Sequence, residues 1–495
     1  MILIKIIPND RTPIYHQIID QIIDLIEKRS LEMGENLPSS RELAETLGID
    51  RTTVYRAYAE LNALGYTESR PGSYTKVRKR PEVGTQILYS HKGIITWDKK
   101  SNENSNELFC YFKRFFPEST RKKSADLINL SPLDLDNRIF PIDDFRRCLN
   151  QVLVNGGPKI LSYGDHKGFK PLREDLAHRL QIHGIAVTPE EVLITNGAQQ
   201  AIDLILKLFV YPGGSVAIES PTYANIIPLL LYYNANMIGI QMRNDGPDLE
   251  ILERRIVADK PLFFYTIPNF QNPTGITTSQ SHRERLLALC EAHKLPIVED
   301  GFEEEMKYFG KVVLPIKSMD KNKIVIYLGT FSKVLFPGIR IGWIAAEQEC
   351  IMRLMAIKRF TDLSSSTLVQ AAVSTFLRRG YYDLHLKRMH RIFRKRMQVA
   401  LQALKEFLPA NVDWTKPDGG YTIWLTLSSS YKSEESLKNL LSKHGILVSP
   451  GEYYFHKKTQ KKYFRISIAS LNETEIEEGI SRLGKALYEL EYVGK

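Results

Sequence analysis

Short apolar runs recur between residues 192 and 327, separated by amphipathic stretches of ten or more residues. The runs are Val192-Leu193-Ile194, Val216-Ala217-Ile218, Leu262-Phe263-Phe264-Tyr265, Ile297-Val298 and Ile324-Val325-Ile326-Tyr327. Continuous apolar runs are typical of strands that are buried on both faces, and intervening helices favour parallel neighbours. The pattern therefore predicts an α/β domain with a mostly parallel sheet covered by helices.

The length and composition restrict the class of protein. A chain of 495 residues exceeds what one hydrophobic core usually organises, so we expect two or more domains. It has neither an 18-residue apolar run nor a signal-peptide pattern, so we expect a soluble cytoplasmic protein with no membrane partner. Its four cysteines lack CxxC spacing, which argues against a zinc site, and we predict no metal site. The net charge of +10 suits a polyanionic partner.

The first eighty residues predict three helices and a hairpin. Isoleucines at helical spacing indicate a first helix over residues 14–26. Ser39 and Glu42 have the spacing of a capping box that opens a second helix, which Gly48 ends. Asp50 can cap a third helix. Residues 67–77 then predict a two-stranded wing that turns at Pro71-Gly72. This is the arrangement of a winged helix-turn-helix, an α+β fold.

The outer side of the third helix, near its N-terminus, is the candidate face for reading DNA, because recognition helices contact bases there. We expect phosphate contacts from Arg41 and Arg70, and base contacts from the face between Arg51 and Arg56. The alternative is an ordinary solvated helix face. The candidate DNA-binding residues are Ser40, Arg41, Arg51, Thr52, Thr53, Arg56, Arg70 and Gly72.

Residues 81–125 lose helical periodicity and become polar, which predicts a tether between two domains. A coil of this length spans roughly 35–40 Å root-mean-square. Its aromatic stretch, residues 109–116, is a candidate for packing on a specific surface. We therefore divide the chain into residues 1–80, 81–125 and 126–495.

A polar motif follows each apolar run, and ligands in such folds bind at the carboxyl ends of the strands. Gly197 and Ala198 would let backbone amides at a helix start approach a phosphate. The further phosphate donors would be Gln199, Thr330, Ser332 and Arg340. Lys333 follows in Gly329-Thr330-Phe331-Ser332-Lys333, with Arg340 close behind it. A buried site beside a cation would lower the pKa of this lysine, as a nucleophilic amine requires.

In order and spacing, these motifs resemble the fold-type-I aminotransferases over about residues 126–490, which bind pyridoxal 5'-phosphate. The resemblance implies that Lys333 is the Schiff-base residue. It further implies Asp300 for the ring nitrogen, Asn272 for the phenolic oxygen, Tyr223 for ring stacking, Arg340 for the phosphate, Arg465 for a substrate or effector carboxylate, and Tyr163 for the phosphate in a neighbouring subunit. Phe302 stands where the family commonly has a tyrosine hydroxyl donor, so we expect no more than vestigial aminotransferase activity.

The segments LPSSRELA, RTTVYRAYAELNALGY and ESRPGSYT resemble the winged helix-turn-helix of GntR-family bacterial regulators. Joined to an aminotransferase-like domain, they resemble the MocR branch of that family. The resemblance implies a transcriptional regulator that binds operator DNA as a head-to-tail homodimer and senses pyridoxal phosphate, or its external aldimine with an amino compound. The alternatives are an active aminotransferase with an autoregulatory DNA-binding head, and a structural DNA-binding protein that has lost its cofactor.

Overall fold

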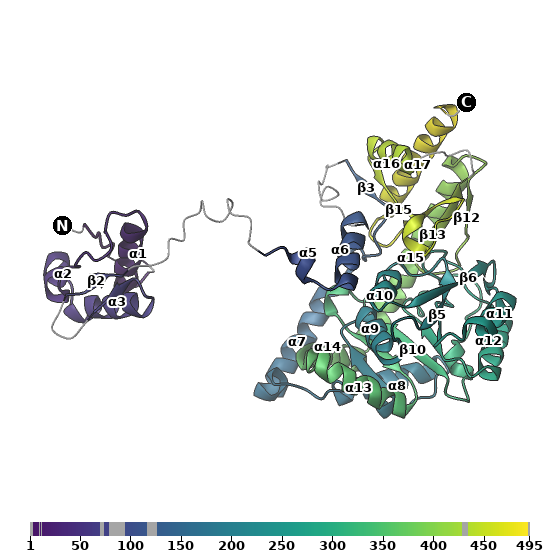
Figure 1. Ribbon diagram of the computed structural model, residues 1–495, viewed down its shortest axis with the longest axis horizontal. Helices are drawn as coiled ribbons and strands as arrows, with labels where there is room; N and C mark the ends of the chain where they lie inside the picture. The colour runs from purple at the N-terminus through teal and green to yellow at the C-terminus, as the bar shows by residue number, and fades with distance from the viewer. Residues whose placement is uncertain are drawn as a thin grey trace. The chain divides into compact units, whose positions relative to one another are not determined.

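The computed structural model describes residues 3–8, 10, 12–69, 74–78, 95–115, 126–427 and 434–493. Residues 1–97 and residues 98–495 form two compact units, which we call the head and the body. In Figure 1 the head is purple, whereas the body runs from dark blue to yellow. No helix in the described ranges has both the length and the apolar character needed to cross a membrane.

The head has the predicted winged helix-turn-helix elements. They are α1 (Ile14–Glu27), α2 (Ser40–Leu47), α3 (Arg51–Ala63), β1 (Thr67–Glu68) and β2 (Lys76–Val77). The side chain of Ser39 accepts a hydrogen bond of 3.1 Å from the amide of Glu42 at the start of α2. Gly48 ends that helix in the left-handed conformation, with φ of 66°. Asp50 then caps α3 by accepting a hydrogen bond of 2.7 Å from the amide of Thr52.

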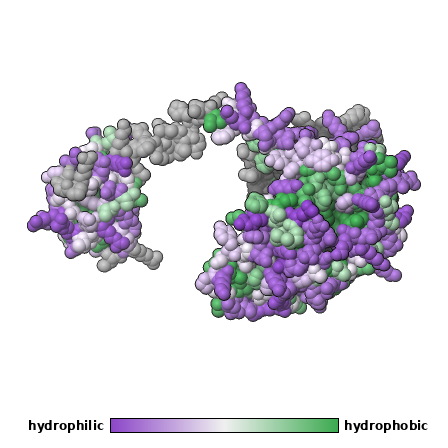
Figure 2. All heavy atoms as spheres, turned by 60° about the horizontal axis from the view of Figure 1, so that its bottom comes forward, coloured by the Kyte–Doolittle hydropathy of each residue, from purple (hydrophilic) through white to green (hydrophobic). Residues whose placement is uncertain are grey.

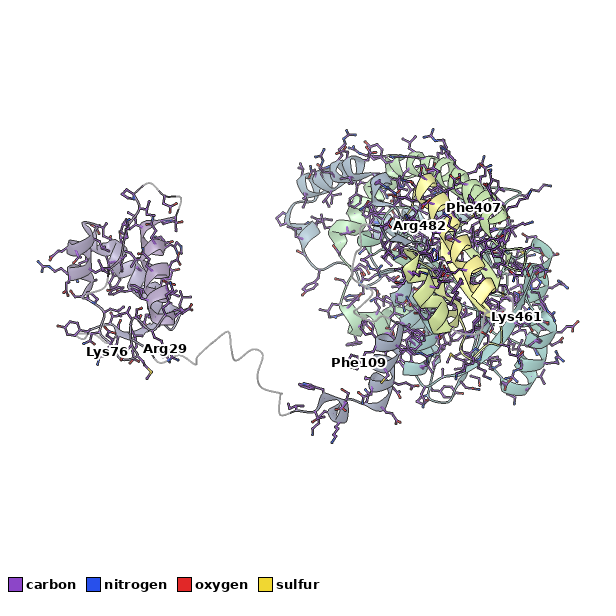
Figure 3. The ribbon with its side chains drawn as sticks, turned by 90° about the horizontal axis from the view of Figure 1, so that it is seen from above. Arg29, Lys76, Phe109, Phe407, Lys461 and Arg482 are labelled. Carbon is purple, nitrogen blue, oxygen red and sulfur yellow. The ribbon has the colours of Figure 1, made fainter. Side chains whose placement is uncertain are left out.

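The isoleucine stripe of α1 packs against α3, where Ile18, Ile22, Val54 and Leu61 are buried together. Strands β1 and β2 pair antiparallel, and Figure 3 labels Lys76 on β2. The predicted wing tip, with Arg70 and Gly72, lies outside the described residues.

The body is built on an eight-stranded sheet with the order β4-β11-β10-β9-β8-β5-β6-β7. The strands are β4 (Val192–Thr195), β5 (Ser215–Ser220), β6 (Asn236–Arg243), β7 (Gly246–Pro247), β8 (Phe264–Thr266), β9 (Ile297–Asp300), β10 (Val325–Thr330) and β11 (Gly342–Ala345). All five predicted strands are present, and the pairs from β10 through β9, β8 and β5 to β6 are parallel. Strand β11, which the sequence analysis did not predict, runs antiparallel to both β10 and β4. Strand β4 consequently points in the same direction as β10.

Alternate side chains of the sheet enter different cores. Tyr265 and Val298 belong to one buried apolar cluster, whereas their neighbours Phe264 and Ile297 belong to another. Helices thus cover both faces of the sheet, as predicted. The α-helices between residues 142 and 378 are α7 (Ile142–Gly156), α8 (Lys170–Ile182), α9 (Ala198–Phe209), α10 (Ile226–Tyr232), α11 (Leu249–Asp259), α12 (Gln280–Ala292), α13 (Gln348–Asp362) and α14 (Thr367–Arg378). The short 3-10 helices of this part of the body are η2 (Asn137–Ile139), η3 (Gly157–Leu161), η4 (Pro189–Glu191), η5 (Ile316–Met319) and η6 (Pro337–Ile339).

A smaller sheet with the order β12-β13-β16-β15 completes the body. Figure 1 shows β12, β13 and β15 with α16 and α17 at the yellow-green end of the chain. The remaining elements are α15 (Tyr381–Phe407), β12 (Asp413–Trp414), β13 (Thr422–Leu427), α16 (Glu434–Lys443), β14 (Ile446–Leu447), β15 (Ser449–Pro450), η7 (Gly451–Tyr454), β16 (Lys462–Ser467) and α17 (Glu473–Val493), together with β3 (Ile128–Asn129), which pairs with β14.

Part of the segment predicted to be coil is helical, which corrects that expectation. Helices α5 (Trp97–Lys100) and α6 (Glu103–Phe115) lie within residues 81–125, and Figure 3 labels Phe109 on α6. Helix α6 is held on the body because Asn104 donates a hydrogen bond of 2.8 Å to the carbonyl of Tyr232 on α10. The Phe115 ring lies 4.5 Å from the Tyr453 ring, centroid to centroid. The aromatic side chains thus stabilise a helix in a segment of polar composition.

Candidate functional site

Lys333 lies just beyond the carboxyl end of β10. Its amine and its backbone carbonyl both form hydrogen bonds with residues that are distant in the sequence. Its Nζ donates a hydrogen bond of 2.9 Å to the carbonyl of Leu133. Its own carbonyl accepts a hydrogen bond from the hydroxyl of Tyr421. Burial lowers the pKa of the Lys333 amine, and the charges of Arg465 and Arg340 act in the same direction. The amine is therefore easier to deprotonate than an exposed lysine.

Asp300 ends the neighbouring strand β9 and has one satisfied and one unsatisfied oxygen. Its Oδ2 accepts a hydrogen bond of 2.7 Å from the hydroxyl of Tyr265 on β8. Its Oδ1 is buried and has no hydrogen-bond partner. Burial raises the pKa of this carboxyl to about 6, against a lowering effect of the Tyr265 hydroxyl. A buried carboxylate oxygen without a partner is suited to accept a proton donor from a ligand.

Asn272 and Arg465, which the sequence places 193 residues apart, are in direct contact. Arg465 NH1 donates a hydrogen bond of 3.1 Å to Oδ1 of Asn272, and NH2 donates to the carbonyl of Ser131. Both side chains are buried. The guanidinium carbon of Arg465 lies 5.3 Å from the ring centroid of Tyr454 on η7. Arg465 is thus a buried, positioned cation and not a solvated one.

Tyr223 follows β5, and a polar network fixes its ring. The hydroxyl donates a hydrogen bond of 3.1 Å to Gln199 and accepts one of 3.0 Å from the side chain of Asn225. Burial raises the pKa of Tyr223 to about 12, and the charges of Asp300 and Arg465 both act on it. Asp300 and Arg465 therefore belong to the same site as Tyr223.

Arg340 lies against the loop after β4, at the start of α9. Gly197 has φ of 88°, and a Cβ atom there would lie 2.8 Å from NH2 of Arg340. Arg340 NH2 donates a hydrogen bond of 2.8 Å to the carbonyl of Asn196. At the end of β10, the hydroxyl of Thr330 donates a hydrogen bond of 3.1 Å to the hydroxyl of Ser332. Ala198 begins α9, so its amide is one of the helix-start donors.

Two residues around Asp300 were not assigned from the sequence. Tyr265 was predicted only as part of an apolar strand, although its hydroxyl fixes Asp300. Glu303 follows Phe302, which is buried in an apolar cluster. Glu303 is buried, and neither of its carboxyl oxygens has a hydrogen-bond partner. Its position three residues after Asp300 is the sequence signal from which Glu303 could have been assigned to the site.

Tyr163 does not join this group within one copy of the chain, because its side chain is 85% exposed. Other exposed apolar side chains precede it on α7 and η3, among them Val154, which is 81% exposed, and Leu161, which is 68% exposed. Figure 2 shows one face of the surface, on which green hydrophobic areas lie among purple hydrophilic ones.

Four of the six predicted DNA-contacting residues that the structure describes are exposed. Arg41, Arg51 and Thr52 are exposed, whereas Ser40 and Thr53 are half-buried. Arg41 forms an ion pair of 3.2 Å with Glu45, and Arg51 donates a hydrogen bond of 3.4 Å to Ser40 across the helix turn.

The side chain of Arg56, which was predicted to contact DNA from the outer face of α3, is restricted by Tyr15. Its guanidinium carbon lies 3.9 Å from the ring centroid of Tyr15 on α1, and its NH2 donates a hydrogen bond of 3.2 Å to the Tyr15 hydroxyl. The side chain is exposed but held in one direction by this aromatic ring.

Comparison with known proteins assigns both units to families. The model of the family "Aminotransferase class I and II" matches residues 125–483, and that of "Bacterial regulatory proteins, gntR family" matches residues 14–77. The chain is 36% identical over 373 residues to aromatic-amino-acid aminotransferase 1 of Thermococcus litoralis, covering 74% of this chain and 89% of the relative. It is 32% identical over 481 residues to the uncharacterized HTH-type transcriptional regulator YdfD of Bacillus subtilis, covering 97% of each.

Among solved structures, LysN is similar to the body. This alpha-aminoadipate aminotransferase of Thermus thermophilus was crystallised in complex with N-(5'-phosphopyridoxyl)-L-leucine. It has a TM-score of 0.74 and 30% sequence identity, over 81% of this chain and 100% of LysN.

Proposed function

The chain belongs to the class I and II aminotransferase family and begins with a DNA-binding domain of the gntR family, and on this premise we propose that it is a cytoplasmic transcriptional regulator that senses pyridoxal phosphate or an amino compound. Members of the aminotransferase family bind pyridoxal phosphate. The observation that carries the proposal is the gathering of Lys333, Asp300 and Arg465 around one site, in a chain that also carries a DNA-binding head.

The residues present fit this cofactor. The unpartnered Oδ1 of Asp300 can accept a proton donor such as a protonated pyridine nitrogen. The absence of a Cβ atom at Gly197 lets the Arg340 guanidinium lie against the start of α9, so that this cation and the helix-start amides could bind a phosphate together. When bound, pyridoxal phosphate supplies an aldehyde that reacts with primary amines and a ring that withdraws electrons. Tyr223 would stack on the ring, and Gln199, Thr330 and Ser332 would hold the phosphate.

Lys333 would form the covalent link, and the surrounding chain prepares it to do so. Burial lowers the pKa of its amine, which increases the fraction that is unprotonated and nucleophilic. The Tyr421 hydroxyl and the Leu133 carbonyl fix the backbone and the amine of this residue. Asn272 would contact the phenolic oxygen through its amide nitrogen, because its Oδ1 already accepts from Arg465.

Arg465 would bind the carboxylate of an amino-compound effector, because it is a buried cation at the same site. A chain of contacts leads from there to α6, near the N-terminal end of the body. Tyr454 lies beside the Arg465 guanidinium, and the adjacent Tyr453 and Glu452 contact Phe115 and Arg114 of α6. An effector that binds two arrangements of the tethered heads with different affinity would shift the equilibrium between them.

The DNA-binding and oligomeric parts of the proposal have separate support. The exposed face of Arg41, Arg51 and Thr52 suits operator DNA, with phosphate contacts from Arg41. Exposed apolar side chains around Tyr163 support a homodimer, in which Tyr163 would reach the partner's phosphate site. We propose the head-to-tail arrangement of two copies.

A second candidate function is an active aminotransferase with an autoregulatory head. It is favoured by the intact set of Lys333, Asp300, Asn272 and Arg465 and by the 36% identity to an aminotransferase. Sustained turnover with an amino acid and a keto-acid acceptor would establish this alternative. Slow or single half-reactions would favour the regulator.

A gel-shift titration with the promoter of the protein's own gene tests the regulator directly. The full-length protein loaded with pyridoxal phosphate should bind this DNA specifically, and removal of the cofactor should change the affinity or the size of the complex. No specific binding at any tested promoter would contradict the proposal.

A further inference from the structure

Asp362 accepts hydrogen bonds from three side chains of the body. It is the last residue of α13, and its Oδ2 accepts a bond of 2.8 Å from the side chain of Asn196 and one of 2.9 Å from the side chain of Gln200. The amine of Lys358, one turn earlier in α13, donates to Oδ1 at 2.8 Å and to Oδ2 at 3.0 Å. Asp362 thereby joins the end of α13 to the segment that begins α9.

Both residues that connect Asp362 to α9 lie at the expected phosphate site. Asn196 directly precedes Gly197, and its carbonyl accepts the hydrogen bond of 2.8 Å from Arg340. Its amide donates a hydrogen bond of 2.7 Å to Oε1 of Gln200, whose side-chain nitrogen donates to Asp362. Asn196 is therefore fixed by its side chain and its amide, and its carbonyl in turn binds Arg340.

The stability of α13 does not account for an aspartate at its last position. A helix carries partial negative charge at its C-terminal end, where a carboxylate is unfavourable. Leu363 follows with φ of 61° and ψ of −62°, and the amide of Ser364 donates a hydrogen bond of 2.7 Å to the carbonyl of Asp362. A turn of this kind is rare and strained. Backbone strain is retained where the surrounding structure holds it, and such places are concentrated at functional sites.

Lys358 neutralises the charge of Asp362. Its side chain is 1% exposed and pairs with the carboxylate through both oxygens. A lone carboxylate beside residues 196–198 would repel a bound phosphate, because like charges interact strongly where water is excluded. The ion pair carries no net charge, so Asp362 can hold these residues without opposing the ligand. A buried ion pair is weak evidence for stability, which favours positioning as the use of this one.

We propose that Asp362, neutralised by Lys358, is a positioning residue that holds residues 196–198 and Arg340 in the arrangement that binds the phosphate of pyridoxal phosphate. The inference rests on the proposed binding of this cofactor and adds which residues give the site its preference for a phosphorylated ligand. Loss of the pair should weaken the binding of pyridoxal phosphate but not that of pyridoxal, which has the same ring and aldehyde without the phosphate.

The test compares the dissociation constants of the two compounds for the full-length protein, measured from the visible absorption that each gives on binding. The double variant with Lys358→Met and Asp362→Leu removes both acceptor oxygens and leaves no unpaired charge buried. Its affinity for pyridoxal phosphate should fall about ten-fold or more, as expected for the loss of one hydrogen bond to a charged group. Its affinity for pyridoxal should equal that of the wild type.

Two further variants make the comparison specific. Lys358→Met with Asp362→Asn keeps one acceptor oxygen, so its loss of affinity for pyridoxal phosphate should be smaller than that of the leucine variant. Glu349→Gln with Arg353→Gln removes an exposed ion pair from the same helix and should leave both dissociation constants unchanged.

Wild-type affinity for pyridoxal phosphate in the leucine variant, or equal losses for both compounds, would overturn the inference and leave the proposed cofactor in place. If circular dichroism showed that this variant does not fold, Gln200→Leu would decide, because it keeps the ion pair and removes the side chain that joins Asp362 to the amide of Asn196. A selective loss there would support the inference, and any other result would overturn it. A wild type that bound neither compound would contradict the proposed cofactor binding and this inference with it.

Discussion

The hydroxyl of Tyr265 donates a hydrogen bond of 2.7 Å to Oδ2 of Asp300, while Oδ1 of the same carboxyl has no partner. One half of the group is thus fixed by the protein, and the other half remains for a ligand. The arrangement orients the carboxyl before any ligand arrives, but leaves it costly to ionise.

The first prediction concerns that cost. The folded pKa of Asp300, about 6, lies above its ordinary value of 3.8, which corresponds to roughly 3 kcal/mol. A carboxyl whose pKa is raised in the folded state costs no stability at a pH below its ordinary pKa. The cost grows as the pH rises from the ordinary pKa to the folded pKa, and it is complete above the folded pKa. Asp300→Asn should therefore raise the free energy of unfolding of the cofactor-free protein by up to about 3 kcal/mol at pH 8, and by little at pH 4.

Urea unfolding at the two pH values measures this difference. The same variant should bind pyridoxal phosphate more weakly. Asp320→Asn is the comparison, because Asp320 is buried but fully partnered by Lys317 and two amides, so its loss should destabilise the protein. Lower stability of Asp300→Asn at pH 8 would contradict the prediction.

The second prediction concerns Lys333. Lys333→Ala should abolish the visible band of the bound cofactor while the circular dichroism spectrum is retained, because the amine would form the covalent link. Lys323→Ala, which removes a side chain that is 59% exposed, should keep the band. An unchanged spectrum in Lys333→Ala would remove the assignment of this residue.

The third prediction separates backbone strain from phosphate binding. Gly197 and Gly213 have φ of 88° and 82°, but only a Cβ atom at Gly197 would meet Arg340. Alanine at Gly213 should cost roughly 1–2 kcal/mol of stability. Alanine at Gly197 should cost about 1–3 kcal/mol from its backbone, because its ψ of 171° is a conformation that essentially only glycine adopts, and more from the contact with Arg340. Only Gly197→Ala should also lose affinity for pyridoxal phosphate more than for pyridoxal. Equal losses of affinity for the two compounds would show that no phosphate binds there.

The fourth prediction concerns DNA. Arg41→Ala should weaken binding to all sequences and flatten the salt dependence by about one unit, because Arg41 is expected to contact a phosphate. Arg56→Ala should cost roughly 1–3 kcal/mol, mainly at the preferred site. Tyr15→Phe keeps the ring beneath Arg56 and controls for the loss of its hydroxyl bond. Gel shifts on specific and random DNA measure both effects, and an equal loss on both for Arg56→Ala would place base reading elsewhere.

The sequence predicted the head and five strands of the large sheet because each depends on local patterns, whereas β6, which pairs in parallel with β5, was not predicted. The caps at Ser39 and Asp50 and the apolar runs act within a few residues of where they appear. Strand β11 was missed although Ile341 to Ala346 form an apolar run, because the run lies directly behind the motif of Lys333 and Arg340 and was not counted among the strands. Helix α6 was missed because the polar residues before its aromatic stretch hide the helical pattern, although that stretch was expected to pack on a specific surface.

The candidate site was predicted in part for the same reason. Motifs at strand ends identify residues that share an edge of the sheet, such as Asp300 and Lys333. Contacts such as Arg465 with Asn272, or Glu303 with the chain at Gly420, join segments more than a hundred residues apart. Local patterns carry no information about such pairs, so these contacts emerge only from the folded chain.

Because α6 packs on other elements of the body, a truncated protein without the head should begin before α6. A fragment that began at residue 126, where the predicted domain starts, or at residue 125, where the family match starts, would lack the helix that contacts α10 and Tyr453. The surfaces left uncovered would include aromatic groups, which favour self-association in a truncated protein. A proteolytic or recombinant body that starts near Asp98 keeps these contacts, and is the piece that we expect to remain monodisperse when the head is removed.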